Sequence, residues 1–139
     1  MSIAFFAYGD PKGQPRPRAF SRGGHARVFD PGTAEGWKGA IAIAAKPCLP
    51  AAPISGPVSI EIAFMFARPG RLRTKKALAM TNLPHTAKPD ADNAAKAVLD
   101  ALTQIGMWTD DALVSRMLVT KEYTDDGRTG AHIRIKEIV

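Results

Sequence analysis

The sequence predicts an α+β fold (mixed α/β), in which a small sheet of about four main strands packs against two helices. Two stretches carry this prediction. Residues 58–67 alternate apolar and polar side chains as a strand does, and residues 90–105 repeat their apolar side chains with the period of a helix. The chain has 139 residues, enough to bury one core but fewer than usually divide into two. We therefore expect a single domain, residues 1–139.

The N-terminal part of the chain predicts a strand and then a loop. Residues 3–9 are rich in β-branched and aromatic side chains and end at Gly9, which predicts a first strand. Residues 10–32 contain four prolines, too many for a regular element. We expect a loop there, with a short strand near residues 26–29.

A helix is predicted over residues 34–46. Asp30 and Thr33 are both residue types that cap helices, and Pro47 would stop the helix. The helix would place three apolar side chains on one face: Trp37, Ile41 and Ala44.

The C-terminal half predicts three strands, a long loop and a second helix. The strand at 58–67 is followed by residues 68–89, which have no sustained period and are either a functional loop or a solvated surface insertion. The second helix starts at Asp90 and ends near Gly106. Its expected apolar stripe consists of Ala91, Ala95, Val98, Leu102 and Ile105. Residues 112–123 and 131–139 are then expected to form a closing hairpin.

The charge balance points to a polyanionic partner. Nineteen Lys and Arg against thirteen Asp and Glu give a net charge of +6, and many of the basic residues cluster at 12–18 and 68–76. A basic protein with no nucleic-acid partner is the simpler alternative. The longest apolar runs are too short to span a bilayer, and the N-terminus does not resemble a signal peptide. With a single cysteine, Cys48, no internal disulfide is possible, which fits a cytoplasmic location.

Five of the thirteen carboxylates fall between Lys88 and Asp111. Asp90 and Asp92 begin the predicted second helix, whereas Asp110 and Asp111 follow it. A straight helix of that length spans about 22 Å, so the chain must fold back if the two pairs are to meet. Carboxylates brought together repel each other unless a cation neutralises them, and oxygen ligands suit Mg²⁺ or Mn²⁺ rather than zinc.

Structural explanations exist for each of these acids. Asp90 and Asp92 could simply cap the helix and favour its dipole, and Lys96 could form ordinary helix-surface pairs with Asp92 and Asp100. The D-x-D spacing also begins a calcium loop of the EF-hand type, but the required glycine and final glutamate are missing.

Other chemistries find little support. The sequence has no phosphate-binding glycine loop, no dinucleotide fingerprint and no nucleophile motif. The three histidines are dispersed, so we expect each to be a surface residue or a phosphate contact: His25, His85 and His132. Trp37 and Trp108 are expected to pack in the core or at its edge rather than to stack on bases.

The full string "KPDADNAAKAVLDAL" followed by "GMWTDD" closely resembles the signature of the RusA family of Holliday junction resolvases. That pattern is K-x-D-x-D-N-x-x-K, then D-A-L, then a D-D pair, and its spacing fits this sequence without a gap. Looser similarity extends over most of the chain. One departure is the alanine content: Ala91, Ala94 and Ala95 stand where relatives often have larger apolar residues, which puts the packing of the helix in question.

The resemblance implies a homodimeric, Mg²⁺-dependent endonuclease that cuts four-way DNA junctions with paired symmetric nicks. It implies that Asp90, Asp92 and Asp111 are catalytic carboxylates that bind the metal, and that Lys96 is the functional lysine. Asp110 is a further metal ligand in this interpretation. Asn93 and Asp100 also match the motif and are expected to have supporting roles.

The basic surplus predicts where DNA lies. Without the four clustered acids, the chain carries nineteen basic and nine acidic residues, a balance of +10. The expected phosphate contacts are Arg16, Arg18, Arg68, Arg71, Arg73, Lys75 and Lys76. Two alternatives remain: a catalytically inert or architectural protein that binds branched DNA, and a metal-dependent nuclease for other branched DNA.

Overall fold

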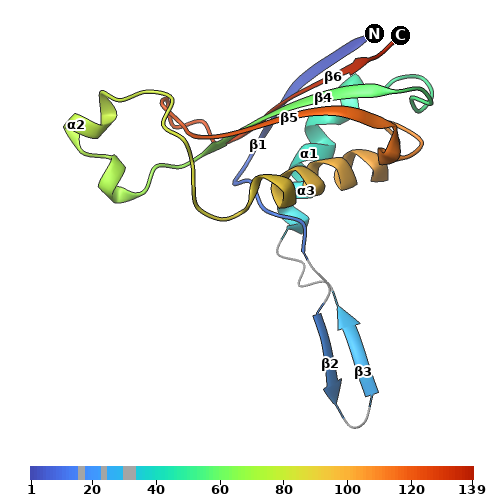
Figure 1. Ribbon diagram of the computed structural model, residues 1–139, viewed down its shortest axis with the longest axis horizontal. Helices are drawn as coiled ribbons and strands as arrows, with labels where there is room; N and C mark the ends of the chain where they lie inside the picture. The colour runs from blue at the N-terminus through green and yellow to red at the C-terminus, as the bar shows by residue number, and fades with distance from the viewer. Residues whose placement is uncertain (16–17, 23–24, 30–33) are drawn as a thin grey trace.

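A four-stranded mixed sheet with two main helices on one face forms the body of the protein (Figure 1). The structure, a computed structural model, describes residues 1–15, 18–22, 25–29 and 34–139, and for 18–22 and 25–29 it describes the backbone alone. The predicted fold class is confirmed. The main elements are β1 (Ser2–Tyr8), α1 (Glu35–Ala45), β4 (Val58–Phe66), α3 (Ala91–Gln104), β5 (Val114–Tyr123) and β6 (Gly130–Glu137).

The strand order is β1-β6-β4-β5. β4 pairs antiparallel with β6 on one side and parallel with β5 on the other. The expected closing hairpin between the last two strands is therefore wrong, because β4 lies between them. The inward side chains of β4 are all at most 5% exposed, from Val58 to Phe66. β4 is thus an interior strand, with a neighbouring strand paired along each of its edges and its apolar side chains in the core.

The helices cover the inner face of the sheet. α1 contacts β1 and α3, and α3 contacts β5. The buried stripe of α3 is wider than predicted, since it includes Ala94, Ala97 and Ala101 as well as the expected Val98 and Leu102, whereas Ala91 is exposed. The alanines explain how this helix packs: small side chains let it lie close to α1 and to the sheet at once.

Several shorter elements complete the chain. The strand expected near residues 26–29 is confirmed as β3 (His25–Phe29), and it pairs with an unpredicted strand, β2 (Arg18–Arg22). The long segment after β4 contains a turn of 3₁₀ helix (Gly70–Leu72) and the short helix α2 (Lys75–Leu78). Two further 3₁₀ turns follow α1 (Lys46–Cys48) and precede β5 (Asp111–Leu113).

The predicted ends of the helices agree in part. Gly106 has φ +81°, the left-handed conformation expected just after α3. Ala34 occupies the N-cap position of α1 without a side-chain hydrogen bond, and the two predicted caps, Asp30 and Thr33, lie outside the described residues. None of the described helices is long and apolar enough to cross a membrane.

Both tryptophans belong to the core, as expected. Trp37 is 4% exposed and Trp108 is 1% exposed. The indole Nε1 of Trp108 donates to Thr103 Oγ1 at 2.7 Å, so this residue fixes the end of α3 against the following turn. The single Cys48 is a free thiol.

Candidate active site

The N-terminal end of α3 carries the first group of predicted site residues. Asp90 is the N-cap residue, but its carboxylate makes no cap hydrogen bond and instead accepts from Lys88 Nζ at 3.0 Å through each of its oxygens. Asp92 lies in the first turn, and Lys96 follows it by one helical turn. All three motif side chains, Asp90, Asp92 and Lys96, are exposed to solvent. This end of α3 therefore offers two carboxylates and an ammonium group to a ligand.

The motif residue Asn93 anchors the loop that follows β1. The backbone carbonyl oxygen of Asn93 accepts a hydrogen bond from the backbone N–H of Gln14 at 3.1 Å. The neighbouring Gly13 lies so close that a Cβ added there would be 2.2 Å from the amide nitrogen of Asn93 and 3.3 Å from Cβ of Pro89. A side chain at position 13 would therefore require the amide group of Asn93 to move. The loop that leads toward the basic residues 16 and 18 is thus attached directly to the N-terminal end of α3, where Asp90 and Asp92 lie.

Asp100, another motif residue, joins three parts of the molecule. Its carboxylate forms an ion pair with Lys38 of α1, and Lys38 is only 7% exposed. The same oxygen accepts from Gln14 at 3.4 Å and from Gln104 at 3.1 Å. Asp100 therefore holds α1 and the β1 loop against α3. Sequence reasoning expected an exposed pair with Lys96 and missed Lys38, because a lysine beside an apolar stripe gives no sign of being buried.

Asp110 and Asp111 carry the second group of predicted site residues. Asp110 caps the 3₁₀ turn that precedes β5, and its Oδ1 accepts from the N–H of Ala112 at 2.8 Å. Asp111 begins that turn and is exposed. The preceding Trp108 forms a bridge with Ile54, just before β4 starts. The pair thus lies at the edge of the sheet where β4 and β5 begin.

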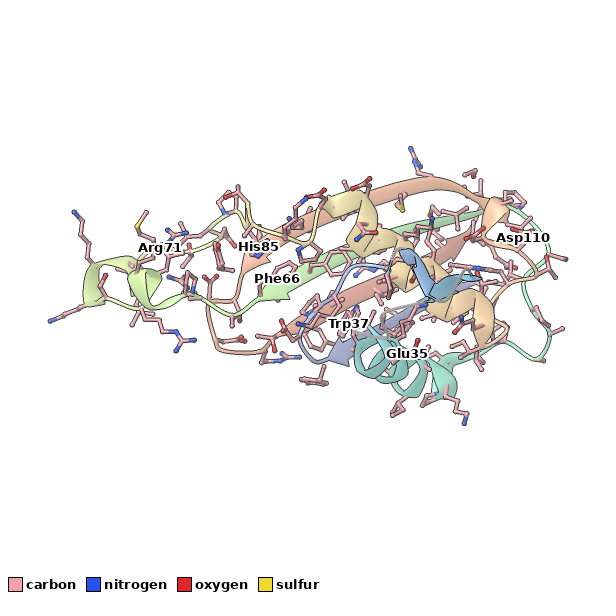
Figure 2. All side chains as sticks on the ribbon, turned by 90° about the horizontal axis from the view of Figure 1, so that it is seen from below. Glu35, Trp37, Phe66, Arg71, His85 and Asp110 are labelled. Carbon is pink, nitrogen blue, oxygen red and sulfur yellow. The ribbon has the colours of Figure 1, made fainter. Side chains whose placement is uncertain are left out.

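The two groups of acids lie at opposite ends of α3. The helix has fourteen residues, which at 1.5 Å each is about 20 Å. β5 also separates the two groups. It starts just after Asp111, and near its far end Lys121 Nζ donates to Ala87 O at 2.9 Å, in the segment before Asp90. Figure 2 shows Asp110 at one end of the molecule and Arg71 at the other. Within the described ranges, no three His, Cys, Asp or Glu residues are grouped closely enough to hold a metal ion.

Asp111 therefore does not fold back to Asp90 and Asp92 within one chain, as the metal interpretation had required. The rigid helix between them, with its buried alanine face, keeps the two groups apart. Each group alone supplies two carboxylates. The donor chemistry of either pair fits Mg²⁺, but the three carboxylates that were expected to share one ion are divided between the two ends of α3.

The basic residues expected to contact DNA fall into three sets. Arg16 lies outside the described residues, and Arg18 begins β2. Four residues on the segment after β4 are exposed: Arg71, Arg73, Lys75 and Lys76. Arg68 is different. It is 6% exposed, and its guanidinium donates to backbone oxygens and to Asp125. Arg68 therefore anchors this segment and is not available as the phosphate contact expected from the sequence.

His85 also departs from its prediction. It is 8% exposed, and its ring stacks on Phe66 with centroids 3.7 Å apart. Burial, and then the nearby charge of Lys121, lowers the pKa of its imidazole below the ordinary value. His85 is thus a neutral packing residue. His132 is exposed on the sheet, as expected, and His25 begins β3.

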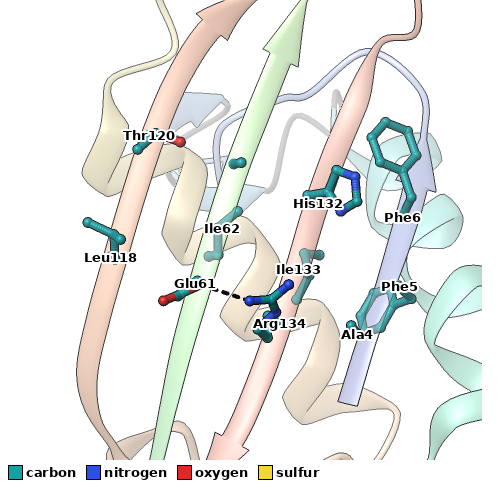
Figure 3. A pocket seen from close by; sticks show the side chains of 11 residues that line it. Ala4, Phe5, Phe6, Glu61, Ile62, Leu118, Thr120, His132, Ile133 and Arg134 are labelled. Atoms are coloured by element: carbon teal, nitrogen blue, oxygen red, sulfur yellow. Dashed lines mark ion pairs between the residues drawn. The ribbon is translucent and has the colours of Figure 1, made fainter. Parts of the chain in front are cut away.

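A shallow hollow of about 410 Å³ lies on the face of the sheet opposite the helices (Figure 3). Phe6, Leu118 and His132 line it, together with Glu61 and Arg134, whose charged groups are 3.9 Å apart. None of the predicted catalytic or metal-binding residues lines it. The candidate active site is therefore on the helix side of the molecule, at the ends of α3.

A basic α+β domain with exposed carboxylates and a lysine at one helix end has the attributes of a nuclease, and the comparisons with known proteins agree. The sequence model of a family described as endodeoxyribonuclease RusA matches residues 8–136. The uncharacterized protein YqaN of Bacillus subtilis (strain 168) is 35% identical over 136 residues, which cover 95% of each chain. The chain therefore belongs to the RusA family of endodeoxyribonucleases.

Proposed function

We propose that this protein is a Mg²⁺-dependent endonuclease that resolves four-way DNA junctions as a homodimer. The observation that supports this most directly is the exposed set Asp90, Asp92 and Lys96 on the first turns of α3 in a RusA family member. The net charge of +6 supports a polyanionic substrate.

Each residue has a proposed part in the reaction. Asp90 and Asp92 would hold the Mg²⁺ ion, and Asp111, with Asp110 beside it, would complete the ligand set. The bound ion supplies charge neutralisation at the scissile phosphate and activation of water. Lys96, one turn from Asp92, would face the phosphate and offset the negative charge that develops there. Lys88 has an exposed ion pair with Asp90, which is weak enough for a metal to displace.

The separation of the two carboxylate groups supports a site shared between two subunits. In a homodimer with twofold symmetry, the Asp110–Asp111 end of one chain can meet the Asp90–Asp92 end of the other. This arrangement produces two complete sites per dimer, as two opposed nicks in a symmetric junction require.

The edge strand β5 is the proposed contact between the subunits. Residues 121–123 of β5 are covered by the segment around Pro84, but Val114–Thr120 form an edge of the sheet with exposed Met117 and Leu118. An uncovered edge of this kind is a template for another strand. Antiparallel pairing of two copies places the start of one β5 beside the end of the other, which brings Asp111 toward the partner's α3.

The test uses labelled four-way, three-way and linear duplex DNA, each with Mg²⁺ or with EDTA. We expect cleavage of the four-way junction with Mg²⁺ only. Cleavage in EDTA would contradict the metal mechanism, and cleavage of all branched substrates alike would favour a general branched-DNA nuclease. Binding without cleavage in either Mg²⁺ or Mn²⁺ would indicate an architectural protein.

The variant Asp92→Asn provides the first specific prediction. Replacing one carboxylate oxygen by an amide removes a metal ligand without changing the basic surface. We expect junction binding to be unchanged and the cleavage rate to fall by at least about a hundredfold. Gel mobility shift and single-turnover cleavage measure the two properties. The matched control is Glu61→Gln on the opposite face of the sheet, which should cleave normally.

A further inference from the structure

The segment after β4 forms a separate projection, which we call the basic lobe and define as residues 67–84. It extends beyond the ends of β4 and β5, away from the body of the protein (Figure 1). It contains a 3₁₀ turn and α2, whose N-terminus is capped by Thr74, with Oγ1 accepting from Ala77 N at 3.2 Å. The lobe thus has a defined structure of its own.

Arg68 fixes the base of the lobe. It donates to Ala77 O at 2.8 Å and Met80 O at 2.6 Å within the lobe, and to Thr124 O at 3.0 Å and Asp125 Oδ1 at 2.8 Å in the turn between β5 and β6. These are charge-assisted bonds, the strong kind. The lobe is therefore held in one orientation before any ligand binds.

The surface of the lobe combines positive charge with exposed apolar side chains. Residues 67–84 include five basic residues and no acidic residue. With Arg68 paired to Asp125, four exposed cations remain: Arg71, Arg73, Lys75 and Lys76. Leu78 and Met80 are 56% and 51% exposed beside them. Exposed apolar side chains that are surrounded by charged residues are a common feature of surfaces that bind a partner.

We propose that the basic lobe binds at the branch point of the DNA, where Leu78 and Met80 contact bases that are no longer stacked. This inference rests on the proposed function. The positive charge of the lobe favours binding to the phosphates of DNA. The faces of unstacked bases at a junction are the apolar surface that such DNA offers to Leu78 and Met80. Leucine and methionine are side chains that proteins insert between base steps, and unstacking costs least where pairing is already interrupted.

The position of the lobe supports the same partner. Its last residues lead through His85, whose N–H donates to Lys121 O at 3.0 Å, to Asp90 only five residues later. The lobe is therefore on the Asp90 side of α3, opposite Asp110 (Figure 2). DNA bound to the lobe would continue toward the carboxylates that the cleavage reaction requires.

The experiment measures base unstacking without cleavage. A synthetic four-way junction carries 2-aminopurine either at the crossover or within an arm, and the full-length protein is titrated in EDTA. We expect wild-type protein to increase the fluorescence at the crossover but not in the arm. The double variant Leu78→Ser/Met80→Ser should lose most of that increase while its Kd rises by about threefold or less, because the phosphate contacts remain. Ile43→Ser, at an exposed apolar residue of α1, is the matched control.

A second variant tests the charge of the lobe. Lys75→Ala/Lys76→Ala should reduce the slope of log K against log salt by about 3.6, since each subunit of the proposed dimer loses two phosphate contacts and each contact contributes about 0.9. Two results together would overturn the inference: a salt slope of the Lys75/Lys76 variant equal to that of wild type, and a crossover fluorescence increase in the Leu78/Met80 variant as large as that of wild type. A changed sedimentation coefficient of the DNA-free Leu78/Met80 variant would also overturn it, since the lobe would then contact a second copy of the chain. Failure of wild-type protein to bind the junction would instead contradict the proposed function itself.

Discussion

At the scale of single residues, the carboxylates of the motif differ in what they do. Asp90 and Asp92 are exposed, and Asp90 forms a surface ion pair with Lys88, whereas Asp100 is half-buried and bonded to Lys38 and two glutamines. The motif therefore contains two exposed carboxylates and one that holds parts of the fold together. The sequence alone could not separate them, because the partners Gln14 and Lys38 are remote along the chain.

Gly13 gives a prediction at this scale. A methyl group at this position would displace the side-chain amide of Asn93, next to the backbone hydrogen bond that joins the β1 loop to α3. We expect Gly13→Ala to slow junction cleavage by about tenfold, as small misplacements of catalytic elements do, while the melting temperature changes little. Gly39→Ala in α1 is the control, since nothing lies within 4 Å of its added Cβ and alanine favours a helix. Equal cleavage rates for both variants would show that the contact does not position the site.

His85 gives a prediction for pH. Its pKa in the folded protein is below the ordinary value of about 6.5 that applies after unfolding, so the unfolded state takes up the proton first as pH falls. The stability that the neutral ring provides is therefore present above about pH 6.5 and is lost as pH falls from there toward the folded pKa, by at most about 1.4 kcal/mol per pH unit.

Urea unfolding at several pH values measures this loss. His85→Phe should keep the stacking on Phe66 and reduce the pH dependence between about pH 6.5 and 5. His132→Gln, at an exposed histidine, is the control and should leave that dependence in place. A wild-type protein whose stability is constant over this range would contradict the prediction.

At the scale of elements, the sequence correctly predicted those strands and helices whose apolar side chains repeat with a regular period. The alternation of β4 and the helical repeat of α3 appear as expected, because both reflect burial of one face. Pairing was missed, because the alternation of β5 and β6 carries no information on which neighbour each strand has. The lobe was missed as a structure for another reason: Arg68 organises it through backbone oxygens, and no sequence pattern marks such bonds.

The lobe gives the prediction at this scale. Replacing Arg68 by Gln removes the buried charge-assisted bonds to Ala77, Met80 and Asp125, which should cost about 2 to 3 kcal/mol of local stability. Amide hydrogen exchange in α2 should become faster by at least about tenfold, with the sheet unaffected. Arg71→Gln, at an exposed arginine of the same lobe, should leave the exchange rates unchanged. Equal protection of α2 in both variants would mean that Arg68 does not hold the lobe.

At the scale of the whole molecule, the carboxylates that were predicted to share a metal ion lie at opposite ends of α3 in one chain. The sequence identified the acidic residues but could not show whether they lie close together. The distance between them depends on whether α3 and β5 are continuous over their full length. Both elements are regular: α3 spans about 20 Å and β5 about 33 Å, so neither brings the two carboxylate groups together. The site that we propose, shared across a twofold axis, would satisfy this geometry and would supply the two cuts of the proposed reaction.

Mixed dimers test the shared site. Asp92→Asn and Asp111→Asn should each be inactive alone. In a heterodimer of the two variants, a shared arrangement combines the intact Asp92 of one subunit with the intact Asp111 of the other, so one of the two sites is restored. Random mixing yields half heterodimers, each with one of two sites intact, and we expect about a quarter of the wild-type nicking rate. The product should be nicked junctions rather than resolved duplexes.

The control is a mixture of Asp90→Asn with Asp92→Asn, refolded together in the same way. Both substitutions fall at the same end of α3, so every site of this heterodimer lacks one carboxylate and no activity should return. If each chain held its own complete site, neither mixture would recover activity, because every subunit would carry a defect. Recovery in the first mixture and not in the second is therefore expected only when the active site is built from the α3 start of one subunit and the α3 end of its partner.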